Sequence, residues 1–208
     1  MRSADVPAVH VEALHGAAIG RVLQPLAELR IEVFCDYPYL YDGDVAYEAW
    51  YLERFANAPD ALLVAARDGD RLIGAATAAP LIHEHEDFQA PFRGCGIDPA
   101  TVFYLAESVL LPTYRGCGIG HAFFDQREAA ACRLGFARTA FCAVIRPMDH
   151  PSRPAGYRPL DGFWRKRGYH PIDGLTTTFP WRELGQAEET AKPMQFWLRA
   201  LNDALPAG

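Results

Sequence analysis

The chain has 208 residues, of which 50% are apolar and 22% charged, and its formal net charge is −6. This length suits one domain with a sizeable core, and the acidic balance argues against general nucleic-acid binding. No apolar run approaches the roughly 18 residues that a membrane span needs, and the N-terminus lacks a basic-then-apolar signal pattern. We therefore expect a cytoplasmic protein with no nucleic-acid or membrane partner.

The N-terminal part alternates between strand and helix signals. The loose alternation of Val6 to Leu14 predicts a strand, and the apolar spacing from Ile19 to Phe34 predicts a helix. The aromatic and acidic segment 36–44 is too irregular for a helix. A second helix is expected over Val45 to Ala56, with Asp44 as its N-cap.

The middle of the chain holds the sharpest signals. Ala61 to Arg67 and Arg71 to Ala79 predict two strands, because the Asp-Gly between them is typical of a hairpin. Pro80 to Ala100 is a long polar connection. Val102 to Leu111 is apolar on both faces, as expected of an inner strand, and Ile119 to Leu134 has the spacing of an amphipathic helix.

The last third continues the alternation. Ala137 to Ile145 predicts a strand, followed by a proline-rich loop over Pro147 to Pro159 and a short helix over Leu160 to Arg167. Leu175 to Trp181 predicts the last strand, and Met194 to Leu205 predicts a short terminal helix.

The turn before the amphipathic helix reads Arg115-Gly116-Cys117-Gly118-Ile119-Gly120. Glycine inside a helix costs about 1 kcal/mol relative to alanine, so three alternate glycines at a helix start need another reason. Removing side chains there exposes the first N–H groups of the helix, which lack intrahelical acceptors, and the helix dipole favours an anion at that end. The turn therefore predicts a phosphate or pyrophosphate ligand.

The spacing of this turn excludes two common phosphate motifs. A P-loop needs Lys-Ser/Thr after its glycines, and a dinucleotide fold needs glycine where His121 stands. The pattern Arg-x-x-Gly-x-Gly after a strand and a proline turn instead resembles the GNAT superfamily of acyl-CoA-dependent N-acetyltransferases, and the order of the elements from Val6 to Trp181 is similar to that family as well. The matching positions are Leu110, Pro112, Tyr114, Arg115, Gly116, Gly118, Ile119 and Gly120.

This resemblance implies an α/β fold with a central mixed β-sheet, splayed at the coenzyme site, and helices on both faces. It also implies acetyl-CoA as co-substrate, no metal, and a single acetyltransferase domain over residues 1–182. Residues 183–208 would form a C-terminal tail whose short helix packs on the domain or on the partner subunit of a homodimer. The coenzyme-binding residues implied are Ser108, Val109, Leu110, Arg115, Gly116, Cys117, Gly118, Ile119, Gly120 and His121.

Glu107 is the candidate catalytic base. Strand alternation places it on one face with Leu105, Val109 and Leu111, where it is the only ionisable residue. A carboxylate among aliphatic neighbours accepts a proton more readily near neutral pH, as deprotonation of an amine requires, and GNAT enzymes often carry a basic carboxylate on this strand. The alternative is a structural carboxylate paired with an arginine, such as Arg30 on the first helix.

The proton donor to the leaving thiolate is assigned from the same resemblance. Many relatives have a tyrosine in the short helix four residues before a Gly-Phe/Tyr pair, but counting back from Gly168 places Trp164 there. An indole cannot act as a general acid. Tyr157, at the position of a family asparagine, is the substitute that we favour, with a solvent proton as the alternative.

Two segments are candidates for the acceptor pocket. The resemblance places 36–44 along that pocket, where tyrosines and carboxylates suit an ammonium group through cation–π and ionic contacts, although a tyrosine-rich surface turn would have the same composition. In the proline-rich loop, an arginine could fork onto a substrate carboxylate. The candidate substrate residues are Tyr37, Tyr39, Tyr41, Asp149, His150 and Arg153.

Two further features are interpreted as structural. His83-Glu84-His85-Glu86 would put two imidazoles on one side of a strand, but no third ligand is identifiable, so no metal is expected. The five cysteines form no Cys-x-x-Cys pair, which favours reduced and mostly buried thiols.

The sequence thus predicts an N-acetyltransferase that transfers an acetyl group from acetyl-CoA to a primary amine of a small molecule by direct attack. Two alternatives stay open. One is a non-catalytic acyl-CoA-binding or sensing module, which the missing helix tyrosine favours, and the other is an acetyltransferase for protein or peptide amines.

Overall fold

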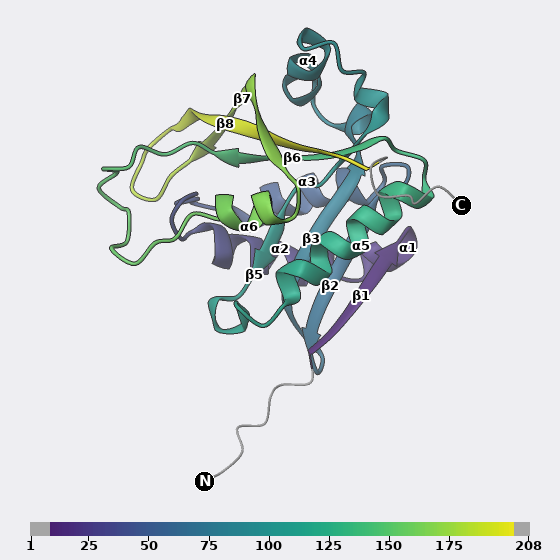
Figure 1. The fold of residues 1–208 in the computed structure, drawn as a ribbon. Helices are drawn as coiled ribbons and strands as arrows, with labels where there is room; N and C mark the ends of the chain where they lie inside the picture. The colour runs from purple at the N-terminus through teal and green to yellow at the C-terminus, as the bar shows by residue number, and fades with distance from the viewer. Residues whose placement is uncertain (1–8, 202–208) are drawn as a thin grey trace.

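The computed structural model describes residues 9–201 (Figure 1). The ends of two predicted elements, residues 6–8 and 202–205, lie outside this range. The helices are α1 (Ala17–Gly20), α2 (Leu23–Phe34), α3 (Val45–Ala56), α4 (Glu86–Gly94), α5 (Ile119–Arg133) and α6 (Asp161–Lys166), with 3-10 turns η1 (Leu81–His83), η2 (Pro99–Thr101) and η3 (Pro112–Tyr114). The strands are β1 (Val9–His15), β2 (Leu62–Asp68), β3 (Arg71–Pro80), β4 (Val102–Tyr104), β5 (Ser108–Leu110), β6 (Arg138–Val144), β7 (His170–Arg182) and β8 (Glu189–Ala200).

One mixed sheet runs through the described residues in the order β1-β2-β3-β4-β6-β8-β7, and β5 pairs with β3 beside β4. The β4–β6 pair is parallel, and the other pairs are antiparallel. Helix α5 packs on β1, β2 and β3, while α2 contacts β3 and β5 and carries α3 (Figure 1). This confirms the predicted α/β fold with a central mixed sheet.

The sequences of β2 and β3 are apolar throughout because both faces of these strands are covered by other parts of the protein. Five consecutive residues of β2 and nine of β3 are buried, as is usual for inner strands that lie between helices. The main core collects residues from α2, β2, β3 and α5. A second cluster lies under β7 and β8, where α4 contributes Phe88 and Phe92.

The two N-terminal helix predictions have different outcomes. The helix over Val45–Ala56 is confirmed, and Asp44 Oδ1 accepts a hydrogen bond from the Tyr47 N–H at 2.8 Å. The single helix over Ile19–Phe34 is wrong, because the chain breaks at residues 21–22 between α1 and α2. Pro25 explains the break: it has no N–H for the carbonyl four residues earlier, and its ring crowds that carbonyl.

The central strand is also divided. In place of one strand over Val102–Leu111, residues 105–107 separate β4 from β5. Arg127 of α5 stabilises the interruption, since its guanidinium donates to the carbonyls of Thr77 and Glu107 at 3.2 and 3.1 Å. Arg127 is only 1% exposed although it is charged, whereas Leu134, the last residue of the predicted amphipathic helix, is 44% exposed.

The predicted splay of the sheet is present at this interruption. β6 pairs with β4 as far as Ala140 and beyond that point pairs with β8 alone. β5 pairs with β3, and within the described chain no strand pairs with its other edge. A wedge therefore opens between β5 and β6.

Two segments correct the sequence predictions more strongly. The polar connection Pro80–Ala100 contains η1, α4 and η2, because Phe88 and Phe92 share one helical face and bury it in the second cluster. The helix over Met194–Leu205 is wrong, since Met194 to Ala200 belong to β8, which lies between β6 and β7. Met194 and Phe196 fit the alternation of a strand as well as the spacing of a helix. Pairing with the neighbouring strands decides in favour of the strand.

The remaining strands agree better with their predictions. β7 is confirmed and is longer than predicted, and it pairs with β8 along most of its length, so the sheet continues past residue 182.

The five cysteines are free as expected, but only Cys142 is buried, which corrects the prediction of mostly buried thiols. None of the helices within residues 9–201 is long and apolar enough to cross a membrane.

Candidate active site

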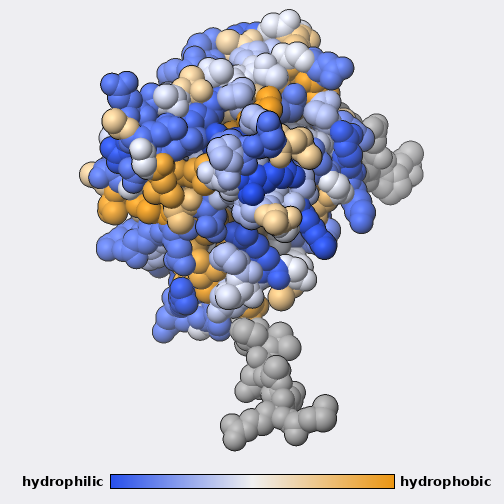
Figure 2. All heavy atoms as spheres, turned by 90° about the vertical axis from the view of Figure 1, so that its left-hand side faces the viewer, coloured by the Kyte–Doolittle hydropathy of each residue, from blue (hydrophilic) through white to orange (hydrophobic). Residues whose placement is uncertain are grey.

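One cleft of about 1760 Å³ extends from the glycine turn to the aromatic segment 36–44. Figure 2 shows apolar side chains gathered between hydrophilic ones on the side of the molecule from which α6, β7 and β8 project. The candidate residues that line the cleft are Tyr37, Tyr39, Tyr41, Glu107, Ser108, Leu110, Arg115, Gly116, Gly118, Gly120, His121, Arg153 and Tyr157. Val109, Cys117, Ile119, Asp149 and His150 are not among its lining residues.

The glycine turn presents bare backbone to the cleft. Gly116 and Gly118 have φ values of 81° and 86°, a region that favours glycine, and a Cβ on either would meet no atom within 4 Å. Gly120 is helical, and its Cβ would meet only Phe163 Cζ at 3.8 Å. Backbone strain therefore explains the first two glycines, while nothing in the described protein requires the third, which favours a ligand in that space.

The N–H groups of this turn are available to such a ligand. Outside α5 itself, none of the N–H groups from Gly116 to His121 donates to another backbone group of the described chain. The first amides of a helix have no intrahelical acceptor. The turn thus combines unpaired donors with the positive end of the 15-residue helix α5.

The open edge of β5 lies next to this turn. The N–H of Leu111 donates to Ile73 and the carbonyl of Glu107 accepts from Thr77, so alternate residues direct their backbone groups to β3. Val109 shares that direction, whereas Ser108 and Leu110 direct theirs into the wedge. The Leu110 carbonyl accepts a hydrogen bond from Arg115 Nε at 3.1 Å.

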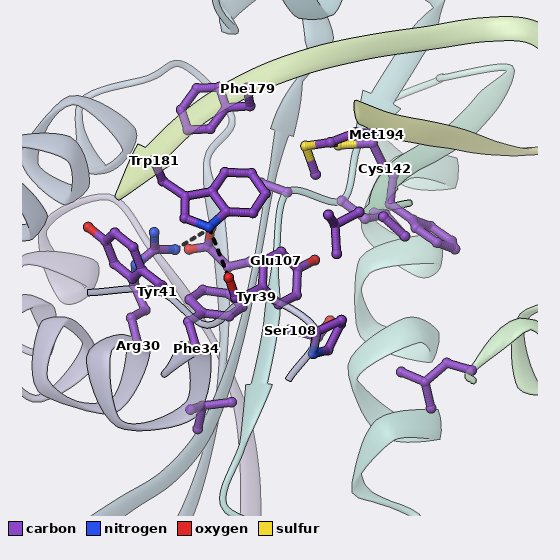
Figure 3. A pocket seen from close by; sticks show the side chains of 18 of the residues that line it. Arg30, Phe34, Tyr39, Tyr41, Glu107, Ser108, Cys142, Phe179, Trp181 and Met194 are labelled. Atoms are coloured by element: carbon purple, nitrogen blue, oxygen red, sulfur yellow. Dashed lines mark hydrogen bonds and ion pairs between the residues drawn. The ribbon is translucent and has the colours of Figure 1, made fainter. Parts of the chain in front are cut away.

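The Glu107 side chain is only 9% exposed; it lines the cleft and is bound to other charged groups (Figure 3). Its Oε2 forms an ion pair with Arg30 and accepts a bond from the Tyr51 hydroxyl at 3.4 Å, and Arg30 also binds the fully buried Glu48. The arginine pairing that the sequence offered as an alternative is therefore present. Burial by itself lowers the pKa of Arg30, but the charges of Glu107, Tyr51 and Glu48 outweigh it and keep that pKa above its ordinary value.

Aromatic side chains form the wall around this charge cluster. Trp181 Nε1 donates to the Tyr39 carbonyl at 2.9 Å, and the rings of Phe34 and Tyr39 lie 4.7 Å apart (Figure 3). Arg146 donates to the same Tyr39 carbonyl at 3.1 Å and pairs with Glu183. These contacts hold the segment 36–44 rigidly against β7. Phe88, Cys142, Phe179 and Met194 also line the cleft.

The proline-rich loop closes the cleft near Tyr37. The Tyr157 ring packs edge-on against Tyr37 at 4.7 Å, and the Arg153 guanidinium lies 5.0 Å from the Tyr157 centroid. His150 contacts Tyr37 from outside the cleft lining. Burial, and the neighbouring Tyr37, raise the pKa of Tyr157, so its hydroxyl keeps its proton near neutral pH.

The structure also explains Trp164, the residue at the position of the family's tyrosine. Its ring contacts Phe141 and Trp197 at 5.0 Å each. Trp164 is therefore part of the aromatic packing between α6, β6 and β8, and its indole lines the cleft.

Glu84 is a cleft residue that the sequence reasoning missed. It follows η1 and lines the cleft near Glu107. Burial, and then the charge of Glu107, raise the pKa of Glu84 to about 7, with a partial offset from Arg54. The only sequence signal was the run His83-Glu84-His85-Glu86, which the sequence reasoning interpreted as structural; the described residues contain no group of three or more His, Cys, Asp or Glu that could hold a metal ion.

Comparison with known proteins identifies the family. The family model described as the acetyltransferase (GNAT) family matches residues 26–158. A search of curated protein sequences returned no significant match. Among solved structures, aminoglycoside 6'-acetyltransferase type Ii is 20% identical with a TM-score of 0.56, covering 96% of this chain and 99% of that one.

Two further solved structures show the same fold. An aminoglycoside 6'-N-acetyltransferase in complex with coenzyme A is 17% identical, with a TM-score of 0.57 and coverage of 96% and 99%. A ribosomal-protein-alanine N-acetyltransferase from Brucella melitensis is 13% identical, with a TM-score of 0.58 and coverage of 92% and 99%. At these identities the likeness concerns the fold, and it agrees with the family match. With the family model spanning more than half of its length, the chain belongs to the GNAT acetyltransferase family.

Proposed function

We propose that this protein is an N-acetyltransferase that transfers an acetyl group from acetyl-CoA to a primary amine of a small molecule by direct attack. The observation that carries the proposal is the continuity of the cleft, which joins the open amides of the glycine turn to an aromatic chamber containing carboxylates. A diphosphate suits the first end, and an ammonium group suits the second. The reacting groups would then meet at β5.

On the coenzyme side, the turn from Arg115 to His121 would hold the diphosphate through its N–H groups. The wedge beside β5 would hold the pantetheine arm through the backbone of Ser108 and the N–H of Leu110, because unpaired backbone groups are costly unless a ligand satisfies them, and the Leu110 carbonyl already accepts from Arg115. Strand direction favours the Leu110 N–H over that of Val109 as the donor that polarises the thioester carbonyl. The fit of acetyl-CoA rests on these unpaired donors.

On the acceptor side, Tyr39, Tyr41 and Trp181 would surround the amine-bearing group, and Glu107 would bind its charge. The ammonium group first loses one proton; the amine nitrogen then attacks the thioester carbon and loses a second proton as the C–N bond forms and the C–S bond breaks, and both protons end in solvent. Tyr157 would donate a proton to the departing thiolate, and solvent would then reprotonate Tyr157. A concave pocket lined mostly by aromatic side chains with a few charged groups is typical of a small-molecule site, which favours a small acceptor over a folded protein surface.

The test is amine-dependent release of CoA. The protein is incubated with acetyl-CoA and a panel of small amines and N-terminal peptides, and CoA is quantified by chromatography, because free cysteines on the protein would consume a thiol reagent. We expect release with small amines and with the matching acetylated product detected by mass. Thermal stabilisation by CoA without turnover on any amine would contradict the proposal and favour an acyl-CoA-binding module.

A further inference from the structure

We propose that Glu84 is the general base that takes the proton from the acceptor ammonium, while Glu107, held in its ion pair with Arg30, contributes to binding that ammonium. This inference rests on the proposed acetyltransferase function and assigns its proton-accepting residue. It differs from the prediction made from sequence, in which Glu107 itself was the base.

The backbone around Glu84 is held firmly. Its N–H donates to the Leu81 carbonyl at 3.0 Å, and its carbonyl accepts from the Gln89 amide at 2.8 Å. The same Gln89 amide also donates to Ile82 at 3.1 Å. The loop after η1 is therefore anchored to α4, and the Glu84 side chain is placed among the residues that line the cleft.

Four side chains from three other elements lie around the Glu84 carboxylate, and each of them has another partner. Tyr51 and Arg54 belong to α3; the Tyr51 hydroxyl donates to Glu107, and the Arg54 guanidinium lies 5.0 Å from the Trp50 centroid. Tyr104 of β4 and Cys142 of β6 bond each other at 3.0 Å. Within residues 9–201, no hydrogen bond or ion pair ends on the Glu84 carboxylate, while His83 and His85 flank it along the chain.

Glu84 and Glu107 are therefore two carboxylates of one cleft in opposite environments. The Glu107 carboxylate is paired with the Arg30 guanidinium. Glu84 is half-buried and has no such partner within the described residues, and burial followed by the charge of Glu107 raises its pKa to about 7. An unpaired carboxyl group whose pKa lies near neutral pH is suited to accept a proton, whereas a carboxylate held in an ion pair is suited to bind charge.

The proton balance follows from these roles. The acceptor enters as R–NH3+, and the ionised Glu84 takes one proton to leave R–NH2 and a neutral Glu84. The amine attacks the thioester carbon and loses its second proton to solvent as the amide forms, while Tyr157 protonates the departing sulfur as the C–S bond breaks and is then reprotonated by solvent. The products are the amide and CoA thiol, and Glu84 releases its proton to solvent before the next turnover.

The experiment measures kcat/KM against pH for the full chain and its variants, using a small amine found to be a substrate. The wild-type rate should fall below a pH near 7, because Glu84 becomes protonated there. Glu84→Gln should lower kcat/KM on the order of 100-fold at pH 8 and abolish this acidic limb, with the Kd for CoA unchanged. Glu84→Asp should keep the limb at a reduced rate.

A matched control is available in the same run of residues. Glu86 lies outside the cleft lining and pairs with Arg93, so Glu86→Gln should leave the pH profile unchanged. Persistence of the limb in Glu84→Gln, or its loss in Glu107→Gln alone, would overturn the assignment while leaving the acetyltransferase function intact. If the wild type turns over no amine, the proposed function fails and this inference fails with it.

Protein stability gives a second readout that does not depend on activity. The pKa of Glu84 is raised in the fold, so the folded state binds more protons than the unfolded state between its ordinary value of 4.5 and about 7. Stability contributed by the protonated group is therefore lost as pH rises through about 7. Glu84→Gln should melt a few degrees above the wild type at pH 8 and close to it at pH 4.5; equal melting temperatures at pH 8 would show that ionised Glu84 is not destabilised in the cleft and would overturn the inference.

Discussion

The two ends of the cleft are built in different ways. The proposed coenzyme end is almost entirely backbone from one continuous stretch, β5 to the start of α5. The acceptor end is made of side chains from α2, α3, η1 and β7, which are distant in the chain. A backbone site tolerates variation in neighbouring side chains, whereas a side-chain site changes its specificity with each substitution. Because of this difference in construction, the coenzyme site can stay the same while the acceptor site varies.

The largest effect is expected at the charge cluster of the acceptor end. Arg30→Met removes the only guanidinium that pairs with the carboxylates of Glu48 and Glu107 in the described chain, leaving two largely buried carboxylates uncompensated. Breaking a buried ion pair from one side costs about 3–5 kcal/mol. The free energy of unfolding, measured by urea denaturation, should fall by that amount. A loss below 1 kcal/mol would show that water already compensates these charges.

The coenzyme end can be tested with two matched glycines. Gly118→Ala places a methyl group beside the open amides at a φ of 86°. Gly135→Ala carries the same kind of backbone strain, at a φ of 80°, just past the C-terminal end of α5. Losing one or two charge-assisted bonds should weaken CoA binding about 10- to 100-fold in Gly118→Ala. Gly135→Ala should leave the Kd unchanged in calorimetry. Equal affinities for both variants would contradict diphosphate binding at this turn.

A smaller effect, confined to the acceptor end, is expected at Trp181. Trp181→Phe retains an aromatic ring but removes the indole bond to the Tyr39 carbonyl. Loss of one hydrogen bond and looser packing of the segment 36–44 should raise the acceptor KM about tenfold. The KM for acetyl-CoA should not change, and steady-state kinetics with each substrate varied separate the two. A change confined to the KM for acetyl-CoA would contradict the division of the cleft into two ends.

The smallest effect is expected at Tyr157. Tyr157→Phe removes the proposed proton donor but keeps the edge contact with Tyr37. A free thiol has a pKa of about 8.5, so solvent can supply the proton and kcat should fall less than about tenfold. Rates at saturating substrate provide the measurement. A loss of 1000-fold or more would mean that the donor is obligatory.

The fold was predictable where local chemistry was decisive. Asp44 caps α3, the Asp-Gly pair turns the β2–β3 hairpin, and the glycine turn begins α5. The prediction for β8 was wrong because its residues fit the spacing of a helix as well as that of a strand. The prediction for α4 was wrong because the segment is mostly polar and only two phenylalanines mark its buried face. In such segments the choice is made by contacts with distant residues.

By itself, the sequence determined the family, the mixed α/β fold and the glycine turn, because all three depend on residues adjacent in the chain. Only the tertiary structure decided that Glu107 is paired with Arg30, that Arg127 is buried at the strand interruption, and that Glu84 forms no ion pair within the described residues. The physical reason is that a charge depends on its surroundings in space, and helices and strands from remote parts of the chain supply those surroundings.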